Sequence, residues 1–311
     1  MGGLHLRNPV LAASGTFGYG TEVLLLDRRH LGGMVSKGIF LEPRAGNPPP
    51  RIAETAAGML NAIGLQGPGV EALISDYAPL WASWDFPVLV NINAERVETY
   101  GELAARLDGV PGISGLEVNI SCPNVRQGGM FFGSDPQAAG RVTAAVRRHT
   151  RLPIWVKLTP QAASVGEVAR AVEAEGADAV CAINTLAGTI FDSATGLPAL
   201  AFGHGGLSGP AILPVALYLA RAAAAAVKIP VVGVGGIGNG EDALQFLFAG
   251  CSAVQVGTAT FLDPQAIEHV ARGLQRLLAS LPPRAEERLL GLPAAPLIEL
   301  ARRGFADPER G

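Results

Sequence analysis

The sequence has few cysteines and few charges, and each scarcity excludes a class of protein. Its 311 residues include only three cysteines, Cys122, Cys181 and Cys251, and no Cys-x-x-Cys pair. A disulfide scaffold, a metal site or an iron–sulfur site within this chain is therefore not expected, and a reducing cytoplasm fits the composition. Charged residues make up 16% of the chain and the net charge is −3. No basic surface for nucleic acid or for an anionic membrane is predicted.

Long apolar runs are also lacking. No stretch approaches the roughly 18 uninterrupted apolar residues that a membrane span needs. Residues 1–9 lack the apolar run of a signal peptide. Hydrophobic residues nonetheless make up 49% of the chain, which is enough to bury a large core.

Short apolar runs, each followed by a polar or glycine-rich loop and then a helix-like stretch, recur along the chain. The runs are Val10–Ala13, Gly33–Ser36, Val88–Ile92, Leu116–Ile120, Ile154–Leu158, Ala179–Ile183, Val231–Val234 and Ala253–Val256. Helices are expected near Glu22–His30, Val97–Leu107, Pro136–His149, Val165–Glu175, Pro214–Val227 and Asp242–Ala249. Eight strand-then-helix units predict an α/β fold, a single-domain (β/α)₈ TIM barrel over residues 1–311. The proline-rich piece Glu42–Arg51 is expected to be a surface excursion, and the polar tail 282–311 has no predicted structure.

The predicted strand ends are polar, and in such barrels the carboxyl ends of the strands carry the active site. Cys122 follows the strand Leu116–Ile120 and is flanked by Asn119 and Asn124. An ionised thiol there could accept a proton while the amides hold a planar ligand. The alternative is a buried cysteine that acts as a small hydrophobe; Cys181 and Cys251 are read in that way.

Two lysines lie in or directly after apolar strands. Lys37 follows the second run, and Lys157 lies within Ile-Trp-Val-Lys-Leu. A buried lysine needs a partner, so each is expected to meet an anion. The partner could be a ligand or a strand-end carboxylate, for which Glu117 is the nearest candidate.

The loops after the last two strands are rich in glycine. Gly233, Gly235 and Gly238 match Gly-x-Gly-x-x-Gly, and Gly257-Thr258 follows the eighth run. Loops at these two places form the usual phosphate cradle of a barrel, so a phosphate-bearing cofactor is expected. A dinucleotide fingerprint and glycines that only permit tight turns are the alternatives.

The sequence resembles the class 1 dihydroorotate dehydrogenases, which are flavin-dependent enzymes of pyrimidine synthesis. The matching motifs are Ala13-Ser-Gly, Gly46-Asn-Pro-Pro-Pro-Arg, Gly58-Met-Leu-Asn-Ala-Ile-Gly-Leu, Asn119-Ile-Ser-Cys-Pro-Asn, Val156-Lys-Leu, Ile183-Asn-Thr-Leu, Gly206-Leu-Ser-Gly-Pro and Gly233-Val-Gly-Gly-Ile. They occur in the family's order over about four-fifths of the chain. The stretch Ala57–Gln66 is most similar to the NAD-linked subclass (1B). Gly38 stands where members often have Ala or Thr, and Ala94 where Gly is common.

The resemblance implies oxidation of (S)-dihydroorotate to orotate with one non-covalent FMN as hydride acceptor. It implies Cys122 as general base, and the loop Pro123–Gly133 could be a lid over it. The substrate-binding residues it implies are Lys37, Asn61, Ala62, Ile63, Gly64, Leu65, Asn119, Asn124, Asn184 and Thr185. The FMN-binding residues it implies are Ser14, Lys37, Gly38, Asn91, Asn119, Lys157, Ile183, Gly209, Gly235, Gly236, Gly257 and Thr258.

The resemblance also implies a partner. In the NAD-linked subclass a separate subunit carries FAD and an iron–sulfur (2Fe-2S) cluster, and two catalytic chains form a homodimer core within a heterotetramer. The three cysteines here are too few and too dispersed to hold such a cluster. An exposed apolar patch near the flavin is expected to mark the docking site. The alternatives are a fumarate-linked (1A) enzyme, a flavin reductase of another pyrimidine or of a tRNA uridine, and a barrel that binds a phosphorylated ligand without redox chemistry. The absence of a basic surface run argues against the tRNA version.

Overall fold

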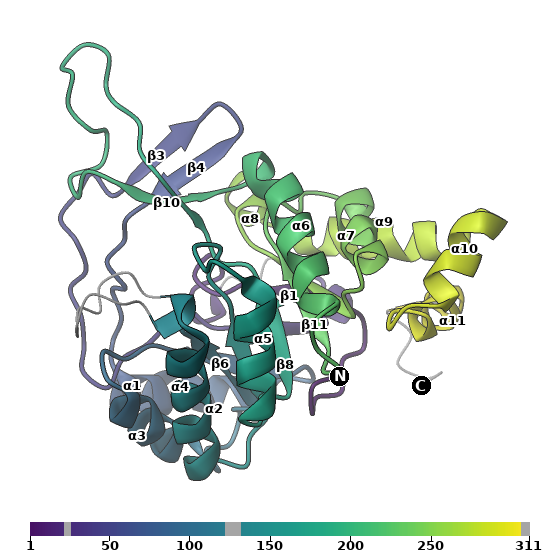
Figure 1. The fold of residues 1–311 in the computed structure, drawn as a ribbon, viewed down its shortest axis with the longest axis horizontal. Helices are drawn as coiled ribbons and strands as arrows, with labels where there is room; N and C mark the ends of the chain where they lie inside the picture. Colours follow the sequence, from purple (N-terminus) through teal and green to yellow (C-terminus); the bar gives the residue numbers. More distant parts are fainter. Residues whose placement is uncertain (22–25, 122–131, 306–311) are drawn as a thin grey trace.

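Eight parallel strands close into a barrel in the computed structural model, which describes residues 1–21, 26–121 and 132–305 (Figure 1). The order around the barrel is β1-β12-β11-β8-β7-β6-β5-β2. The strands are β1 (Val10–Ala12), β2 (Gly33–Val35), β5 (Val88–Ile92), β6 (Gly115–Asn119), β7 (Ile154–Lys157), β8 (Ala179–Ala182), β11 (Val231–Val234) and β12 (Ala253–Val256). All eight predicted strands are present, several ending one residue early, and the predicted TIM barrel is confirmed.

Most of the predicted outer helices are also present. They are α3 (Val97–Leu107), α4 (Pro136–His149), α5 (Val165–Ala174), α6 (Leu213–Ala224) and α7 (Gly240–Phe248). Two helices that were not predicted, α8 (Ala259–Leu262) and α9 (Ala266–Ala279), follow β12. Ser164 and Asn239 accept hydrogen bonds from the first backbone N–H groups of α5 and α7, as good N-caps do. Gly176 and Gly250 follow these helices with φ of 93° and 100°, so both act as the predicted terminators.

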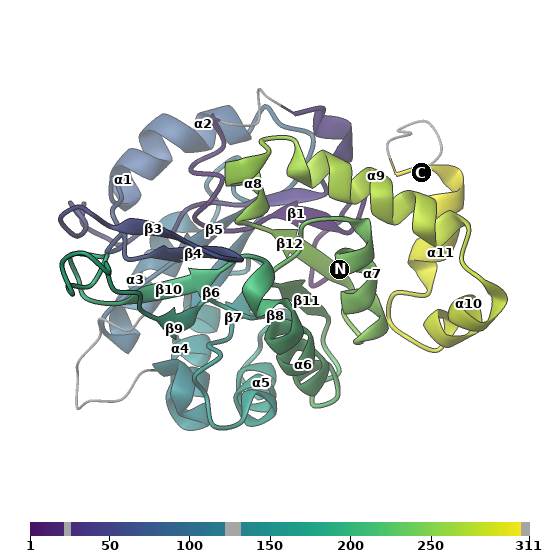
Figure 2. The same cartoon turned by 90° about the horizontal axis from the view of Figure 1, so that it is seen from above.

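The sequence-based interpretation missed a second sheet, which projects beyond the barrel in Figure 1 and is seen over the barrel strands in Figure 2. It is antiparallel, in the order β3-β4-β10-β9. Its strands are β3 (Ile52–Thr55), β4 (Gly58–Asn61), β9 (Leu186–Gly188) and β10 (Gly205–Ser208). The two halves come from the segments that follow β2 and β8, so the sheet belongs to the carboxyl end of the barrel. The proline-rich piece that was expected to be an excursion leads directly into it.

Other local predictions need correction. A helix over Glu22–His30 is not found in its described part, where Asp27 caps only a short 3-10 turn, Arg28–His30. An unpredicted helical stretch runs through α1 (Val70–Ala72), a π-helical turn (Leu73–Tyr77) and α2 (Ala78–Trp81). The tail holds two helices, α10 (Pro283–Leu290) and α11 (Pro296–Arg303), and α11 packs along α9. Among the described residues, no helix combines the length and the apolar character that crossing a membrane requires.

Side chains inside the barrel form an apolar layer with a polar layer above it. Because side chains alternate along each strand, Leu89, Trp155 and Ala179 point inward at the amino ends and pack into one cluster. Two residues later on the same strands come Asn91, Lys157 and Cys181, which lie toward the carboxyl ends. The alternation that builds the core therefore also brings polar groups to one level near the barrel mouth.

Candidate active site

The polar layer inside the barrel consists of Asn91, Glu117, Lys157, Cys181 and Gln255. All five residues are at most 4% exposed. Glu117 is at the centre: its Oε1 accepts from Asn91 Nδ2 at 2.8 Å, and its Oε2 accepts from Gln255 Nε2 at 2.8 Å. Gln255 also contacts Cys181 Sγ at 3.5 Å. Five different strands thus contribute one side chain each to a single network.

Glu117 carries its charge although it is fully buried. Burial alone would raise its pKa, but the nearby Lys157 ammonium and the hydrogen bonds from Gln255 and Asn91 bring the pKa below its usual value. The same burial, together with the Glu117 charge, raises the pKa of the Cys181 thiol well above its ordinary range. Cys181 is therefore a neutral packing group, as the sequence predicted.

Lys157 lies at the upper edge of this layer. Its Nζ donates to Ser14 Oγ at 2.9 Å and lies 3.6 Å from Glu117 Oε1. The carboxylate partner that the sequence offered as an alternative is therefore present. Ser14 and Lys157, both predicted to bind FMN, are brought together although they lie 143 residues apart in the chain.

Asn119 and Asn184 adjoin the polar layer. Asn184 Nδ2 donates to Asn119 Oδ1 at 3.3 Å, and Asn119 pairs in register with Lys157 on the neighbouring strand. The hydroxyl of Tyr100 donates to the backbone oxygen of Asn119 at 2.7 Å. Two amides predicted to hold the substrate are thus side by side. Ile183, the residue before Asn184, is buried and donates its N–H to Val234 O at 2.9 Å.

Lys37 and Gly38 follow β2 at the same end of the barrel. Gly38 lies against Asn91 and Asn93, and an added Cβ would be 2.6 Å from Asn91 Oδ1, so a side chain does not fit there. Lys37 is half-buried, and no described carboxylate forms an ion pair with it. Burial and the neighbouring Arg51 guanidinium lower the pKa of Lys37. A pair of cations that shares no counter-charge within the described chain is a natural place for an anion.

The loops after β11 and β12 are adjacent, because Val234 pairs with Gln255. The backbone N–H groups of Gly235, Gly236, Gly257 and Thr258 make no hydrogen bond to any residue in the described ranges. The backbone N–H groups at the start of α7 are not available in the same way, because the side chains of Asn239 and Asp242 already accept hydrogen bonds from them. An anion would therefore be held by the N–H groups of these loops and not by those at the start of α7.

The remaining predicted residues are on the second sheet and its borders. Asn61 Nδ2 donates to Gly206 O at 3.3 Å, and Thr185 packs against the same glycine. Asn47 holds Ala62 and Ile63 through their backbone oxygens, and Gly64 and Leu65 turn with positive φ. Gly209 lies beside Thr258. Cys122, Asn124 and most of the predicted lid, through residue 131, lie outside the described residues.

Glu117, Gln255 and Arg51 were not predicted as site residues. Glu117 was considered only as a partner for Lys157, and Arg51 was part of a motif without a role. The sequence did contain a signal for Glu117 and Gln255. Each is a charged or amide residue between two apolar residues of a strand, as in Leu-Glu-Val and Val-Gln-Val. Such a residue points into the barrel and needs a partner there.

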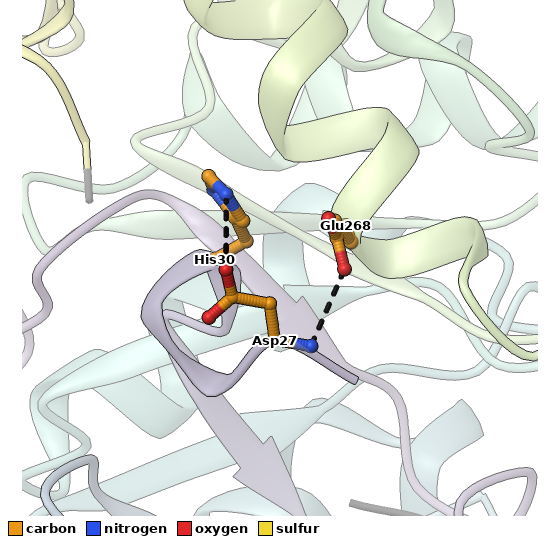
Figure 3. A group of neighbouring side chains, drawn as sticks. All are labelled: Asp27, His30 and Glu268. Atoms are coloured by element: carbon orange, nitrogen blue, oxygen red, sulfur yellow. Dashed lines mark hydrogen bonds and ion pairs between the residues drawn. The ribbon is translucent and has the colours of Figure 1, made fainter. Parts of the chain in front are cut away.

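A second group of titratable side chains lies before β2, where Asp27, His30 and Glu268 converge (Figure 3). Each of these side chains already has an arginine partner. Arg272 forms an ion pair with Glu268 at 2.7 Å and donates a hydrogen bond to His30 Nε2 at 3.1 Å. Arg29 forms an ion pair with Asp27 at 2.7 Å. Burial and Arg272 lower the pKa of His30, so this ring stays neutral. These contacts connect α9 to the 3-10 turn Arg28–His30.

Comparison with known proteins assigns the family. The profile of the family described as "Dihydroorotate dehydrogenase" matches residues 1–278. The "Dihydroorotate dehydrogenase B (NAD(+)), catalytic subunit" of Geobacter sp. (strain M21) is 53% identical over 278 residues, which are 89% of this chain and 91% of that protein. Proteins of the same description from Citrifermentans bemidjiense (51% identical; 93% of this chain, 95% of that protein) and Desulforudis audaxviator (49%; 93% and 94%) are also similar. The chain belongs to the dihydroorotate dehydrogenase family.

Proposed function

We propose that this chain oxidises (S)-dihydroorotate to orotate with bound FMN and passes the electrons to NAD through a partner subunit. Membership of the family supports a dihydroorotate dehydrogenase of pyrimidine biosynthesis. The observation that carries the finer proposal is a grouping at one barrel mouth. It comprises a buried lysine, loop N–H groups that make no hydrogen bond to any described residue, and the cations Lys37 and Arg51, which have no carboxylate partner among the described residues.

The residues at the mouth fit FMN. Gly235, Gly236, Gly257 and Thr258 offer N–H groups to its phosphate, and Lys157 with Ser14 offers donors to its ring system. Gly38 lets the backbone lie directly against the side chains of Asn91 and Asn93. Thr16 Oγ1 and Asn93 Oδ1 are buried near these glycines without a partner in the described chain, as expected of atoms that a ligand satisfies.

The substrate would lie between the cofactor and the second sheet. Lys37, with Arg51 behind it, suits the carboxylate of dihydroorotate, because ion-assisted hydrogen bonds are strong in a half-buried site. Asn61, Asn119, Asn184 and Thr185 supply amides and a hydroxyl for the ring, with Asn124 as a further candidate outside the described residues. Ala62–Leu65 would line the same pocket.

Cys122 is proposed as the base that removes the proton from C5 of dihydroorotate. Its thiolate would take this proton, and Lys37 and the asparagines would hold the ring in place for that transfer. Bound FMN would supply the acceptor for the hydride from C6. Because a thiol is mostly protonated near pH 7, the rate should rise with pH as the thiol ionises.

The relatives are described as NAD(+)-linked catalytic subunits, and this chain has too few cysteines for an iron–sulfur cluster. A partner with FAD and a 2Fe-2S cluster is therefore part of the proposal, with the catalytic chains as the homodimer core of a heterotetramer.

The test is oxidation of dihydroorotate by the purified yellow chain with a dye, NAD, fumarate or quinone as acceptor. We expect turnover with the dye and none with NAD until the partner subunit is added. Rapid turnover with fumarate would instead assign the fumarate-linked subclass. A colourless chain that oxidises nothing would overturn the proposal as a whole.

A further inference from the structure

Glu117 uses both of its oxygens, and Lys157 does not use all of its hydrogens. The two carboxylate oxygens accept from Asn91 and Gln255, each at 2.8 Å. Lys157 has three N–H donors, and its hydrogen bond within the described chain goes to Ser14. The 3.6 Å between Nζ and Glu117 Oε1 is too long for a hydrogen bond, so this pair interacts mainly through charge. The carboxylate is fixed and the ammonium keeps donors for a ligand.

We propose that Glu117 is a positioning residue that offsets the charge of Lys157, and thereby sets how readily bound FMN is reduced. The inference rests on the proposed function, because it assumes that FMN lies beside Lys157. It goes further by assigning a role to a buried carboxylate whose two oxygens already accept hydrogen bonds from Asn91 and Gln255.

Lys157 and Glu117 together are neutral, which suits the uncharged ring system of oxidised flavin. Reduced flavin carries an additional negative charge, and Lys157 favours it while Glu117 opposes it. At separations of several ångströms in a partly buried site, one charge changes such an equilibrium by on the order of tenfold. Removal of the Glu117 charge should therefore favour reduced FMN.

Glu117→Gln removes the charge and keeps the shape. Gln255 Oε1 is buried and has no partner in the described chain, so this amide can turn over and accept from the new nitrogen. Asn91 can donate to the remaining oxygen as before. The variant thus changes the charge of the polar layer with little change in its hydrogen bonds.

The measurement is the ratio of reduced to oxidised FMN in the loaded chain, at equilibrium with a reference dye. We expect this ratio to rise about tenfold in Glu117→Gln at equal dye composition. Glu268→Gln is the matched control, because Glu268 is also a buried carboxylate paired with a cation, Arg272, but lies outside the polar layer. Its ratio should equal that of the parent.

A double-variant cycle tests whether Glu117 acts through Lys157. In a Lys157→Gln background, Glu117→Gln should change the ratio much less than it does in the parent. An unchanged ratio in the FMN-loaded single variant, or an undiminished effect in the double variant, would overturn the assignment.

A second measurement needs no flavin and no folded Glu117→Gln chain. In Lys157→Gln, Glu117 loses its cation and should take up a proton, which gives the infrared band of a buried carboxylic acid at neutral pH. The parent and Glu268→Gln should lack this band. An ionised Glu117 in Lys157→Gln would contradict the coupling, whereas a parent chain that holds no FMN would contradict only the proposed function.

Discussion

The two lysines at the barrel mouth occupy opposite electrostatic environments. Lys157 lies beside the buried carboxylate of Glu117, and this pair is neutral before any ligand arrives. Lys37 lies near Arg51 and has no carboxylate partner in the described ranges, so its side of the mouth is positive. The first arrangement suits a group that is neutral when it binds and gains charge later, as a flavin does. The second suits a group that is already an anion, as a substrate carboxylate is.

The largest expected effect concerns the proposed base, Cys122. Cys122→Ser should lower dihydroorotate oxidation at pH 7 by about 10²- to 10⁴-fold, because a hydroxyl is a much poorer base than a thiolate. FMN content and orotate binding should be retained, since both lysine sites are intact. Equal rates for variant and parent between about pH 6 and 9 would remove Cys122 from the role of base.

Lys157→Ala tests the neutral pair. It leaves Glu117 buried without a cation, and unpaired buried charges typically cost about 3–5 kcal/mol of unfolding free energy. We also expect weaker FMN binding or slower flavin reduction. Urea unfolding of the flavin-free chain measures the first effect, and Lys157→Ala/Glu117→Gln should recover part of the loss. Full stability, full FMN content and full reduction rate in the single variant would show that the pair has no such role.

Lys37→Ala should behave in the opposite way. Loss of an ion-assisted hydrogen bond should weaken orotate binding about 10- to 100-fold. The unfolding free energy should hardly change or should rise, because the variant relieves repulsion between Lys37 and Arg51. Titration of orotate and urea unfolding on the same preparation separate the two effects. A variant that unfolds as easily as Lys157→Ala would remove the distinction between the sites.

The smallest expected effect is on pH dependence. Lys37 binds an anion only while protonated, and burial together with Arg51 lowers its pKa. Orotate affinity should therefore fall with rising pH earlier than an ordinary lysine would allow. Arg51→Gln removes one of the two causes and should move this fall to higher pH. The direction is opposite to the rise in rate from thiol ionisation, so binding of orotate and not turnover is the quantity to measure.

The sequence predicted the parts of this molecule that obey strong local rules. Runs such as Val88–Ile92 are apolar because both faces of a barrel strand are covered, and helices such as α3 have clear apolar spacing. The second sheet escaped prediction because its strands contain several glycines and gain their order from pairing between segments far apart in the chain. The helices of the tail have few buried residues, including Leu289 and Ile298, so composition alone made the region look polar.

The site was predicted as a set of residues but not as a network. Asn91, Asn119 and Lys157 could be selected from the sequence, because polar residues are unusual at the ends of apolar strands. The link from Lys157 to Ser14, and the central place of Glu117, depend on barrel closure and on which side of each strand faces inward. Sequence spacing does not contain that information until strand register is known.

The burial of two cysteines makes the chain a convenient target for selective labelling. Cys181 and Cys251 are fully buried, and burial raises the pKa of both thiols. A thiol reagent in neutral buffer should therefore leave these two unmodified as long as the barrel stays folded. Of the three cysteines, only Cys122 remains as a target. A probe placed by such a reagent would report on the proposed base in the natural chain, and protection by orotate would show in the labelling rate.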